Sequence, residues 1–525
     1  MYRYNHAAAA RNRSRPGRDD AGGIESGALG DGDRDIRPPE ETLDPSDWEA
    51  FRAEAHRMVD RMIEWQRDVR ERAAWQAVPE AVEAGYRTSA PAEGVGAAGA
   101  LADFESMVLP YPTGLQHPRF WGWAGGNGSP MGMLADLLAS GMNAVPGNFN
   151  DGAARVELQV LEWMKEALGY PREAGGIMLS GGSVANLAGL AVARDEAAGF
   201  DVRAHGVGSA PWRLVLYAST EVHSSVFKAA KLLGLGREAV RLVGVDASYC
   251  IRVSELESQI ERDRGEGLRP FAIVGTAGTI NTGSIDDLNA LADVAARERL
   301  WFHVDGAFGA MAALSPATRA LVDGMSRADS LAFDFHKWMY VNYEAGCVLV
   351  RDADAQRRTF AAGGDYLRPL PRGTGSWPDI AGGRGPQLSR GFKALKVWLT
   401  VKEHGFAKFG RLVAQNVEQA RYLAARIDAS TSLERVAPVA LNVVAFRAQL
   451  PDLTDEAADE VNRELLMRLQ ESGLAVPSGT ILDGRFVLRA CVCNHRSVRA
   501  DFDAFVDAAE RILIDAVRES AVAQV

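Results

Sequence analysis

The stretch Trp301–Ala307 reads WFHVDGA, a short apolar run that ends in an acid followed by a glycine. An acid in this position is typical of the carboxyl edge of a parallel sheet, where ligands of α/β folds bind. A buried carboxylate needs a cationic partner, and a protonated pyridine nitrogen is one such partner. Asp305 is therefore a candidate site residue, although a structural salt bridge or a helix cap explains it equally well when it is taken alone.

Short apolar runs alternate with helical patterns on both sides of this stretch. The expected strands are Gly176–Leu179, Arg213–Tyr217, Phe271–Val274, Leu300–Val304, Leu331–Phe333 and Cys347–Val350. Helical spacing lies between them, as in Arg155–Gly169. Strands that alternate with helices predict an α/β fold, with a mostly parallel central sheet and helices on both faces.

Composition excludes several classes of function. The net charge of −11 disfavours a nucleic-acid partner or an anionic membrane surface, because both need a basic face. Four cysteines are too few for a disulfide scaffold, and we expect them to be reduced core residues. The sequence has no apolar stretch near the roughly 18 residues of a membrane span. A cytoplasmic protein is expected.

Three further segments carry residues with useful chemistry. Ser180–Asn186 reads SGGSVAN and leads from a strand through a glycine-rich turn into a helix, whose free N–H groups suit a phosphate. Asp334–Trp338 reads DFHKW, and desolvation there would make the Lys337 amine a nucleophile. His223, which follows a strand, could stack on a planar ring or act as an acid. A structural turn, a surface lysine and a packed histidine are the alternatives for each segment taken alone.

Together these segments resemble the group II pyridoxal-phosphate decarboxylases, which include the aromatic amino acid, histidine and glutamate decarboxylases. Each segment follows an expected strand, and Lys337 comes 32 residues after Asp305. The resemblance runs from about Asp44 to the C-terminus. The matching motifs are HPRF at 117–120, GGS at 181–183, HSS at 223–225, HVD at 303–305 and HKW at 336–338.

The resemblance implies the fold of aspartate aminotransferase (fold type I) and a homodimer with its active site at the interface. Pyridoxal 5'-phosphate is the implied cofactor and an amino acid the implied substrate. Lys337 would form the Schiff base with the cofactor, and Asp305 would keep its pyridine nitrogen protonated. His223 would stack on the ring while contacting the substrate, and Tyr366 would protonate the product carbon. The implied cofactor-binding set is Gly182, Ser183, His223, Thr279, Asp305, Ala307, His336 and Lys337.

The chain departs from the family pattern in three places. Asp334-Phe335 stands where familiar members often have Asn-Pro, which puts an acid where a neutral amide helps to bind phosphate. Ile280 replaces a second threonine after Thr279. Trp121–Gly128 reads WGWAGGNG and differs from the stretch that lines the substrate pocket of the aromatic members. The identity of the substrate therefore does not carry over.

The chain is expected to have four parts. Residues 1–42 lack apolar periodicity and suggest a disordered tail. Residues 43–120 form an expected N-terminal helical dimerisation segment, in which Asp44 caps a helix with an apolar stripe from Trp48 to Trp65. Residues 121–395 make the large cofactor-binding domain, and 396–525 a small C-terminal α+β domain. Within the large domain, the glycines and prolines of 361–386 suggest a mobile loop.

The favoured function is decarboxylation of an L-amino acid to the corresponding amine and carbon dioxide. An aldehyde synthase is the first alternative, and the family links that outcome to replacement of the loop tyrosine or the stacking histidine, both retained here. An aminotransferase on the same fold is the second, since fold does not fix reaction. A metal enzyme using His223, His303, Asp305 and His336, and a non-catalytic protein, are the remaining alternatives.

Overall fold

The computed structural model describes residues 41–147, 149–361, 368–376 and 381–523. Most of the expected N-terminal tail therefore lies outside the described residues. The chain divides into two compact units, residues 1–53 and 54–525. Helix α1 (Trp48–Arg67) begins after Asp47, whose Oδ1 accepts hydrogen bonds from the backbone N of Glu49 and Ala50 at 3.0 and 2.9 Å. The expectation that Asp44 caps this helix was wrong, because Asp47 directly precedes the first turn and reaches its free N–H groups.

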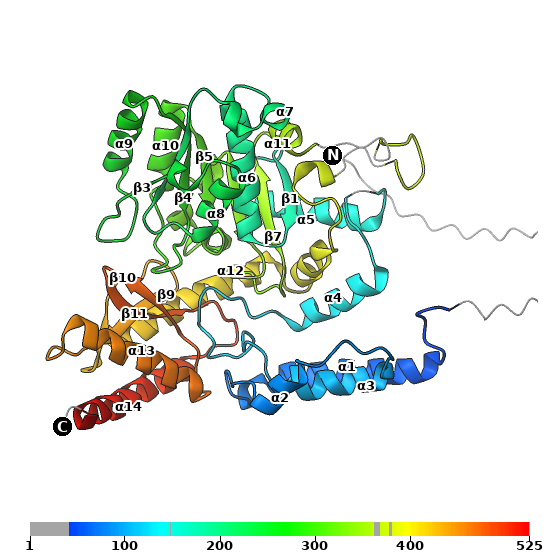
Figure 1. The fold of residues 1–525 in the computed structure, drawn as a ribbon, viewed down its shortest axis with the longest axis vertical. Helices are drawn as coiled ribbons and strands as arrows, with labels where there is room; N and C mark the ends of the chain where they lie inside the picture. The colour runs from blue at the N-terminus through cyan, green and yellow to red at the C-terminus, as the bar shows by residue number, and fades with distance from the viewer. Residues whose placement is uncertain (1–40, 148, 362–367, 377–380, 524–525) are drawn as a thin grey trace, which may run out of the picture. The chain divides into compact units, whose positions relative to one another are not determined.

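The central sheet of the larger unit has, among the described residues, seven strands in the order β1-β7-β6-β5-β4-β2-β3 (Figure 1). Neighbouring strands from β6 to β3 are parallel, whereas β7 runs antiparallel to both β1 and β6. The expected mostly parallel sheet is confirmed. The strands are β1 (Gly175–Leu179), β2 (Leu214–Ser219), β3 (Val240–Val243), β4 (Arg269–Thr276), β5 (Trp301–Asp305), β6 (Ser330–Asp334) and β7 (Gly346–Val350).

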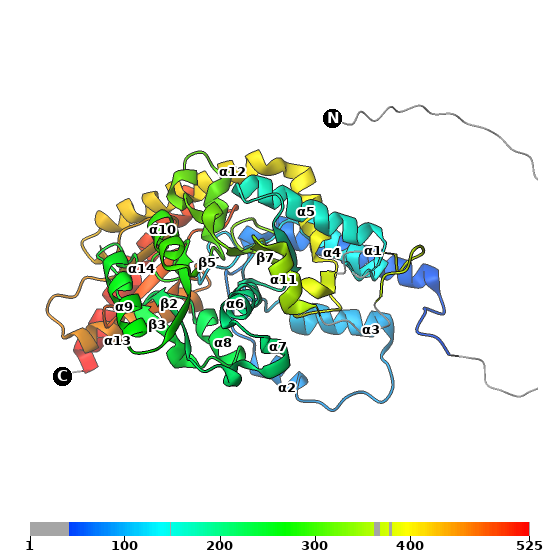
Figure 2. The same cartoon turned by 90° about the horizontal axis from the view of Figure 1, so that it is seen from above.

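Helices cover both faces of this sheet because successive strand side chains point to opposite faces. In β1, Ile177 and Leu179 belong to the apolar cluster of α6, while Met178 belongs to the cluster of α5. Figure 2 shows the two layers from above. One face carries α6 (Gly182–Ala198), α8 (Ser224–Leu232) and α11 (Ala353–Phe360), and the other carries α5 (Gly152–Leu168), α9 (Val253–Gly265) and α10 (Leu288–Glu298).

A smaller antiparallel sheet of order β10-β11-β9-β8 forms the C-terminal part, as expected. Its core also holds Trp121, which stacks on Phe502 with ring centroids 4.7 Å apart. The bounds are α12 (Lys393–Asp428), β8 (Leu433–Arg435), β9 (Val443–Ala448), α13 (Asp455–Glu471), β10 (Ser478–Leu482), β11 (Arg485–Cys491) and α14 (Arg499–Ala523).

The remaining helices are short or lie before the central sheet. They are α2 (Glu80–Gly85), α3 (Gly96–Asp103), α4 (Pro130–Met142) and α7 (Val202–His205). Among the described residues, none of the helices combines the length and the apolar character that crossing a bilayer requires. All four cysteines have free thiols, and three of them are buried.

Candidate active site

The chemistry-bearing segments meet at one edge of the central sheet. Asp305 is the last residue of β5 and Asp334 is the last residue of β6. His223 follows β2, and the glycine-rich turn follows β1. Strands β1, β2, β4, β5 and β6 share one direction, so their carboxyl ends lie at the same edge. The expected gathering of these residues is therefore explained by strand direction.

The glycine-rich turn forms a cradle for an anion at the N-terminus of α6. No side chain among the described residues caps this helix, so its first N–H groups are available to a ligand. A Cβ added at Gly182 would lie 3.1 Å from Oδ2 of Asp334 and 3.2 Å from Cβ of Ala307. At Gly181 the nearest atom would be Cε1 of His336, at 3.2 Å. Glycine at positions 181 and 182 thus allows the turn to lie close to the segments that carry Ala307 and Asp334–His336. Ser183 is exposed in the first turn of α6.

Lys337 presents its amine to two carboxylates. Its Nζ lies 3.1 Å from Oδ2 of Asp334, and 22% of its side chain is exposed. Burial lowers the pKa of Lys337, but the attraction of Asp334 and Asp305 outweighs it and leaves the pKa above the usual value. Oδ1 of Asp334 has no hydrogen-bond partner among the described residues, although Asp334 is only 1% exposed. A buried acceptor is therefore left open beside the anion cradle.

Asp305 is held in place by two donors. Its Oδ2 accepts a hydrogen bond from Nδ2 of Asn186 at 2.8 Å, and its Oδ1 accepts one from the backbone N of Ala307 at 3.1 Å. The residue is 4% exposed. A carboxylate fixed in this way, with room to accept one more hydrogen bond, suits a cationic N–H group of a ligand.

Two histidines flank this centre. Nδ1 of His223 lies 2.8 Å from Oγ of Ser225, and desolvation lowers the pKa of His223 below its usual value. Nδ1 of His336 lies 2.9 Å from the backbone O of Ala345, and its ring packs 4.3 Å from that of Tyr343. Burial also lowers the pKa of His336. Both rings are therefore held mainly neutral near the amine of Lys337.

Some expected site residues are not brought into this arrangement. The hydroxyl of Thr279 is 2.9 Å from that of Thr282 and accepts a hydrogen bond from the backbone N of Ser284. Its hydrogen bonds therefore stabilise the turn at residues 279–284. Tyr366 lies outside the described residues. The motif at 117–120, a family motif and not an expected site, contacts the C-terminal part, where Nδ2 of Asn494 donates to the backbone O of His117 at 2.7 Å.

The sequence interpretation missed three polar residues of this centre, namely Asn186, Ser225 and Tyr343. Asn186 and Ser225 connect Asp305 to His223. Nδ2 of Asn186 donates to Oδ2 of Asp305 at 2.8 Å and to Oγ of Ser225 at 2.9 Å, and Ser225 contacts His223. One signal was available, because Asn186 is four residues after Gly182 and so shares its helix face. The backbone N of Gly126 donates to the hydroxyl of Tyr343 at 3.3 Å. No sequence pattern connects those two residues.

A metal centre is not supported by this geometry. Within the described ranges, no group of three or more histidine, cysteine or acidic residues could hold a metal ion. Of the proposed ligands, His303 has both ring nitrogens engaged, with Ser330 at 2.8 Å and Asn186 at 3.0 Å. The metal alternative raised by the sequence therefore lacks a coordinating cluster.

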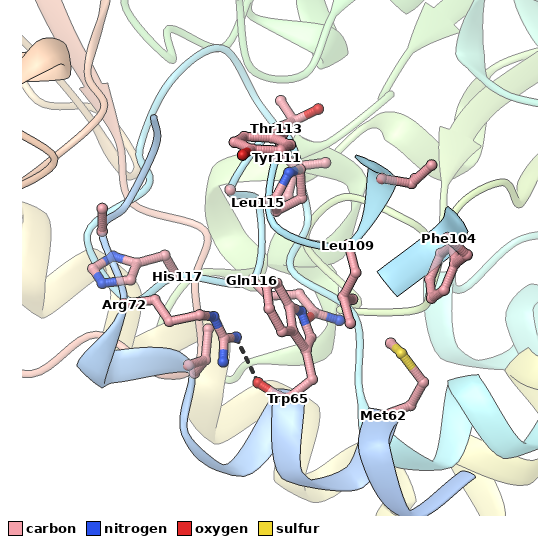
Figure 3. Close-up of a pocket in the computed structure, with 15 residues that line it drawn as sticks. Met62, Trp65, Arg72, Phe104, Leu109, Tyr111, Thr113, Leu115, Gln116 and His117 are labelled. Carbon is pink, nitrogen blue, oxygen red and sulfur yellow. Dashed lines mark hydrogen bonds between the residues drawn. The ribbon is translucent and has the colours of Figure 1, made fainter. Parts of the chain in front are cut away.

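A cavity of about 450 Å³ lies elsewhere, between the end of α1 and the segment 104–117 (Figure 3). Figure 3 shows Met62 and Trp65 pointing from α1 toward the segment that carries Leu109 and Gln116. The guanidinium of Arg72 lies 3.6 Å from the ring centroid of Trp65. The lining is mostly apolar and includes none of the catalytic candidates, so this cavity is not the catalytic centre.

Comparison with known proteins identifies the family. The pyridoxal-dependent decarboxylase conserved domain matches residues 79–449. The chain belongs to this decarboxylase family. An aromatic-L-amino-acid decarboxylase of Bacillus atrophaeus is 36% identical over 389 residues, which cover 73% of this chain and 79% of the relative. Tyrosine decarboxylase 3 of Petroselinum crispum is 30% identical over 503 residues, covering 91% and 95% of the two chains.

A solved structure supports the same conclusion. Oryza sativa TDC, crystallised with PLP and tryptamine, superposes with a TM-score of 0.83 and 27% identity, and the match covers 90% of this chain and 99% of that one. This decarboxylase is thus a fold type I, pyridoxal phosphate-dependent amino acid decarboxylase. Its residues fit the cofactor: the uncapped helix suits the phosphate, the carboxylate of Asp305 suits the ring nitrogen, and the partly exposed amine of Lys337 suits the aldehyde.

Proposed function

We propose that the chain converts an aromatic L-amino acid to its amine and carbon dioxide at the edge of the sheet where Lys337 and Asp305 meet. The observation that carries this proposal is the amine of Lys337, held near two carboxylates, one of which accepts hydrogen bonds from Asn186 and Ala307. The aromatic class is supported by the relatives, which are named for aromatic amino acids and tyrosine.

Within this proposal, Lys337 holds the cofactor covalently through Nζ and Asp305 accepts the proton-bearing ring nitrogen. Bound there, pyridoxal phosphate supplies an electron sink for the pair that remains when carbon dioxide leaves. The N–H groups at Gly182 and Ser183 bind the phosphate, since no side chain of the described residues caps that helix. Ala307 would pack on one face of the ring, since its Cβ lies at the cradle, 3.2 Å from a Cβ added at Gly182.

The two histidines and Thr279 would complete the cofactor site. His223 would stack on the other ring face. Because its Nδ1 is already engaged by Ser225, its Nε2 would donate the hydrogen bond to the substrate. His336 binds near the phosphate, supported by its place beside Gly181. Thr279 contributes through the position of its turn rather than through its hydroxyl, which bonds Thr282.

Tyr366 is proposed to protonate the product carbon. It lies outside the described residues, so its support is the family resemblance alone. A phenol carried on a closing loop can deliver a proton while water is excluded. Retention of this tyrosine and of His223 favours amine release over the aldehyde-forming alternative.

We also propose that the enzyme is a cytoplasmic homodimer whose N-terminal segment, residues 43–120, helps to form the interface. Of residues 54–67 on α1, only Gln66 is buried, although the helix carries Met58, Met62 and Trp65. Helix α4 also leaves large apolar side chains uncovered, since Leu138 and Met142 are 54% and 62% exposed. Apolar surface of this extent favours a second copy as the partner. The four free thiols agree with a reducing compartment.

A second substrate class is favoured by one observation. Arg489 is 2% exposed, and among the described residues its Nε and Nη2 have no oxygen or nitrogen partner, with the weakly accepting thiol of Cys491 nearby. Its Nη1 donates to the backbone O of Trp123, in the stretch expected to line the substrate pocket. A buried guanidinium with open donors can recognise a carboxylate, so an acidic amino acid is the alternative substrate.

A panel of amino acids tests the proposal. Purified enzyme with saturating cofactor is offered aromatic, acidic and basic L-amino acids, with parallel detection of amine, carbon dioxide, ammonia and peroxide. We expect equal amounts of amine and carbon dioxide from an aromatic member, with little peroxide. Turnover of acidic members alone would favour the Arg489 alternative, and one peroxide per carbon dioxide would identify an aldehyde synthase.

A further inference from the structure

A continuous chain of buried polar side chains lies behind the cofactor site. It starts at Trp301, whose Nε1 donates to Oγ of Ser330 at 2.8 Å. The same Oγ lies 2.8 Å from Nδ1 of His303, whose Nε2 lies 3.0 Å from Oδ1 of Asn186. Ser330 and His303 are fully buried and Asn186 is 1% exposed, so these groups depend on one another for hydrogen bonds.

The direction of this chain is fixed at both ends. The indole N–H of Trp301 can only donate, and the carboxylate of Asp305 can only accept. Asn186 must therefore turn its Nδ2 toward Asp305, which leaves its Oδ1 to accept from His303. His303 is neutral, because complete burial lowers its pKa to about 4 despite the nearby Asp305. Its single proton is then on Nε2, and its Nδ1 accepts from the hydroxyl of Ser330.

The second hydrogen of the Asn186 amide extends the chain to His223. Nδ2 of Asn186 donates to Oγ of Ser225 at 2.9 Å, so the hydroxyl hydrogen of Ser225 points to Nδ1 of His223 at 2.8 Å. The backbone N of Ser225 donates to the same Nδ1 at 3.2 Å. Two donors on Nδ1 leave no place for a proton there, so a neutral His223 carries its proton on Nε2.

We propose that Asn186 is a positioning residue that sets the direction of this hydrogen-bond chain and thereby keeps the proton of His223 on Nε2. One amide group then orders two groups of the reaction, Asp305 directly and His223 through Ser225. The inference deepens the proposed function, since it rests on His223 donating from Nε2 to the substrate. With Nε2 as donor, the ring can bind a substrate oxygen without first taking up a proton.

The test reads the tautomer directly. Cofactor-free protein labelled with nitrogen-15 histidine is examined by long-range proton–nitrogen NMR at a pH where the ring is neutral. A His223→Gln sample identifies the signals of this residue among the nine histidines. We expect an unprotonated Nδ1 and a protonated Nε2 in the unaltered protein. A proton on Nδ1 would overturn the proposal.

Variants separate the contributions along the chain. Asn186→Leu keeps the size of the side chain, and Ser225→Ala removes only the relay hydroxyl. Both are expected to reduce the preference for the Nε2 tautomer about tenfold, the effect of losing one hydrogen bond. Ser225→Thr retains the hydroxyl and should restore the preference. Unchanged nitrogen shifts in Ser225→Ala would refute the relay, even if Asn186→Leu does not fold.

The pH titration of His223 gives a second readout on the same samples. Desolvation lowers the pKa of His223, the charges of Asp305 and Asp334 raise it, and those of Lys337 and Lys228 lower it; none of these residues is altered in the variants. We expect the ring of the Ser225→Ala variant to titrate at a higher pH, because the lost hydroxyl donates to the unprotonated Nδ1 and so favours the neutral ring; an unchanged or lower titration pH would contradict the relay. Because these measurements need neither cofactor nor turnover, they stay informative if the substrate proposal fails, and the amino-acid panel tests that proposal separately.

Discussion

Asp334 stands three residues before Lys337 and directs its carboxylate at the amine of that lysine. Oδ2 of Asp334 lies 3.1 Å from Nζ of Lys337. A lysine must lose a proton before it attacks an aldehyde, and the carboxylate opposes this by raising the pKa of Lys337 against the effect of burial. The acid also lies beside the cradle, 3.1 Å from a Cβ added at Gly182, where a phosphate carries like charge. At the scale of single residues, we therefore expect Asp334 to slow capture of the cofactor.

Asp334→Asn is predicted to capture pyridoxal phosphate about tenfold faster at neutral pH, because it lowers the pKa of Lys337 and removes a like charge. The rate is measured by the absorbance of the bound cofactor after mixing with cofactor-free enzyme. Since the neutral amine reacts, the rate should rise with pH, and the variant should reach its plateau at lower pH. Asp136→Asn, which alters the 3.1 Å pair with Lys396, is the control. Equal rates in Asp334→Asn and unaltered enzyme would contradict this account.

Sequence reasoning predicted the residues at strand ends but not their connections. Asp305, Lys337 and His223 were predictable because the carboxyl ends of parallel strands meet at one edge. The link between Asp305 and His223 was not, since it depends on how the side chains of α6 and α8 meet across the face of the sheet. Hydrogen bonds between distant segments follow from tertiary packing, which no local pattern encodes.

At the scale of elements, α6 links the central sheet to the glycine-rich cradle. Its apolar side packs on β1 and β6 while its N-terminus opens at the cradle. The strands around it were predictable from short apolar runs, although the antiparallel direction of β7 and the presence of β3 were not. The direction of β7 depends on its pairing with β1 and β6, which the amino-acid sequence of Cys347–Val350 does not specify. The true cap of α1 was likewise missed, because two aspartates near Pro45 offered equivalent signals.

Gly182→Ala tests the closeness of the cradle. The added Cβ would press on Asp334 and Ala307, so we predict about tenfold weaker cofactor binding with an intact fold. Gly152→Ala is the matched control, since Gly152 also begins a helix but has nothing within 4 Å of the added atom. Affinity is measured by cofactor titration, and folding by thermal unfolding. Normal affinity in Gly182→Ala would show that phosphate does not bind at this turn.

At the scale of the whole molecule, the proposed dimer explains why apolar side chains stay uncovered. Leu138 and Met142 are four residues apart and so share one face of α4. The cavity beside Trp65 is also mostly apolar. A second copy of the chain would bury both features and complete the active site.

Met142→Glu is predicted to weaken the dimer about 100-fold, because a charge buried in an interface without a partner is costly. Sedimentation across a concentration series measures the change, and decarboxylation should fall with the dimer fraction. Leu232→Glu provides the control, since Leu232 is 74% exposed and belongs to α8, which is not among the segments proposed to form the interface. A fully active monomer would refute the proposed role of the interface.

Covalent attachment of the cofactor to Lys337 can be observed by chemical trapping. Enzyme loaded with pyridoxal phosphate is reduced with borohydride, digested and mapped by mass spectrometry. We predict one labelled peptide, with the cofactor mass on Lys337, and no label on that peptide in a Lys337→Ala variant. Labelling of another lysine in the unaltered enzyme, with Lys337 unmodified, would contradict the account.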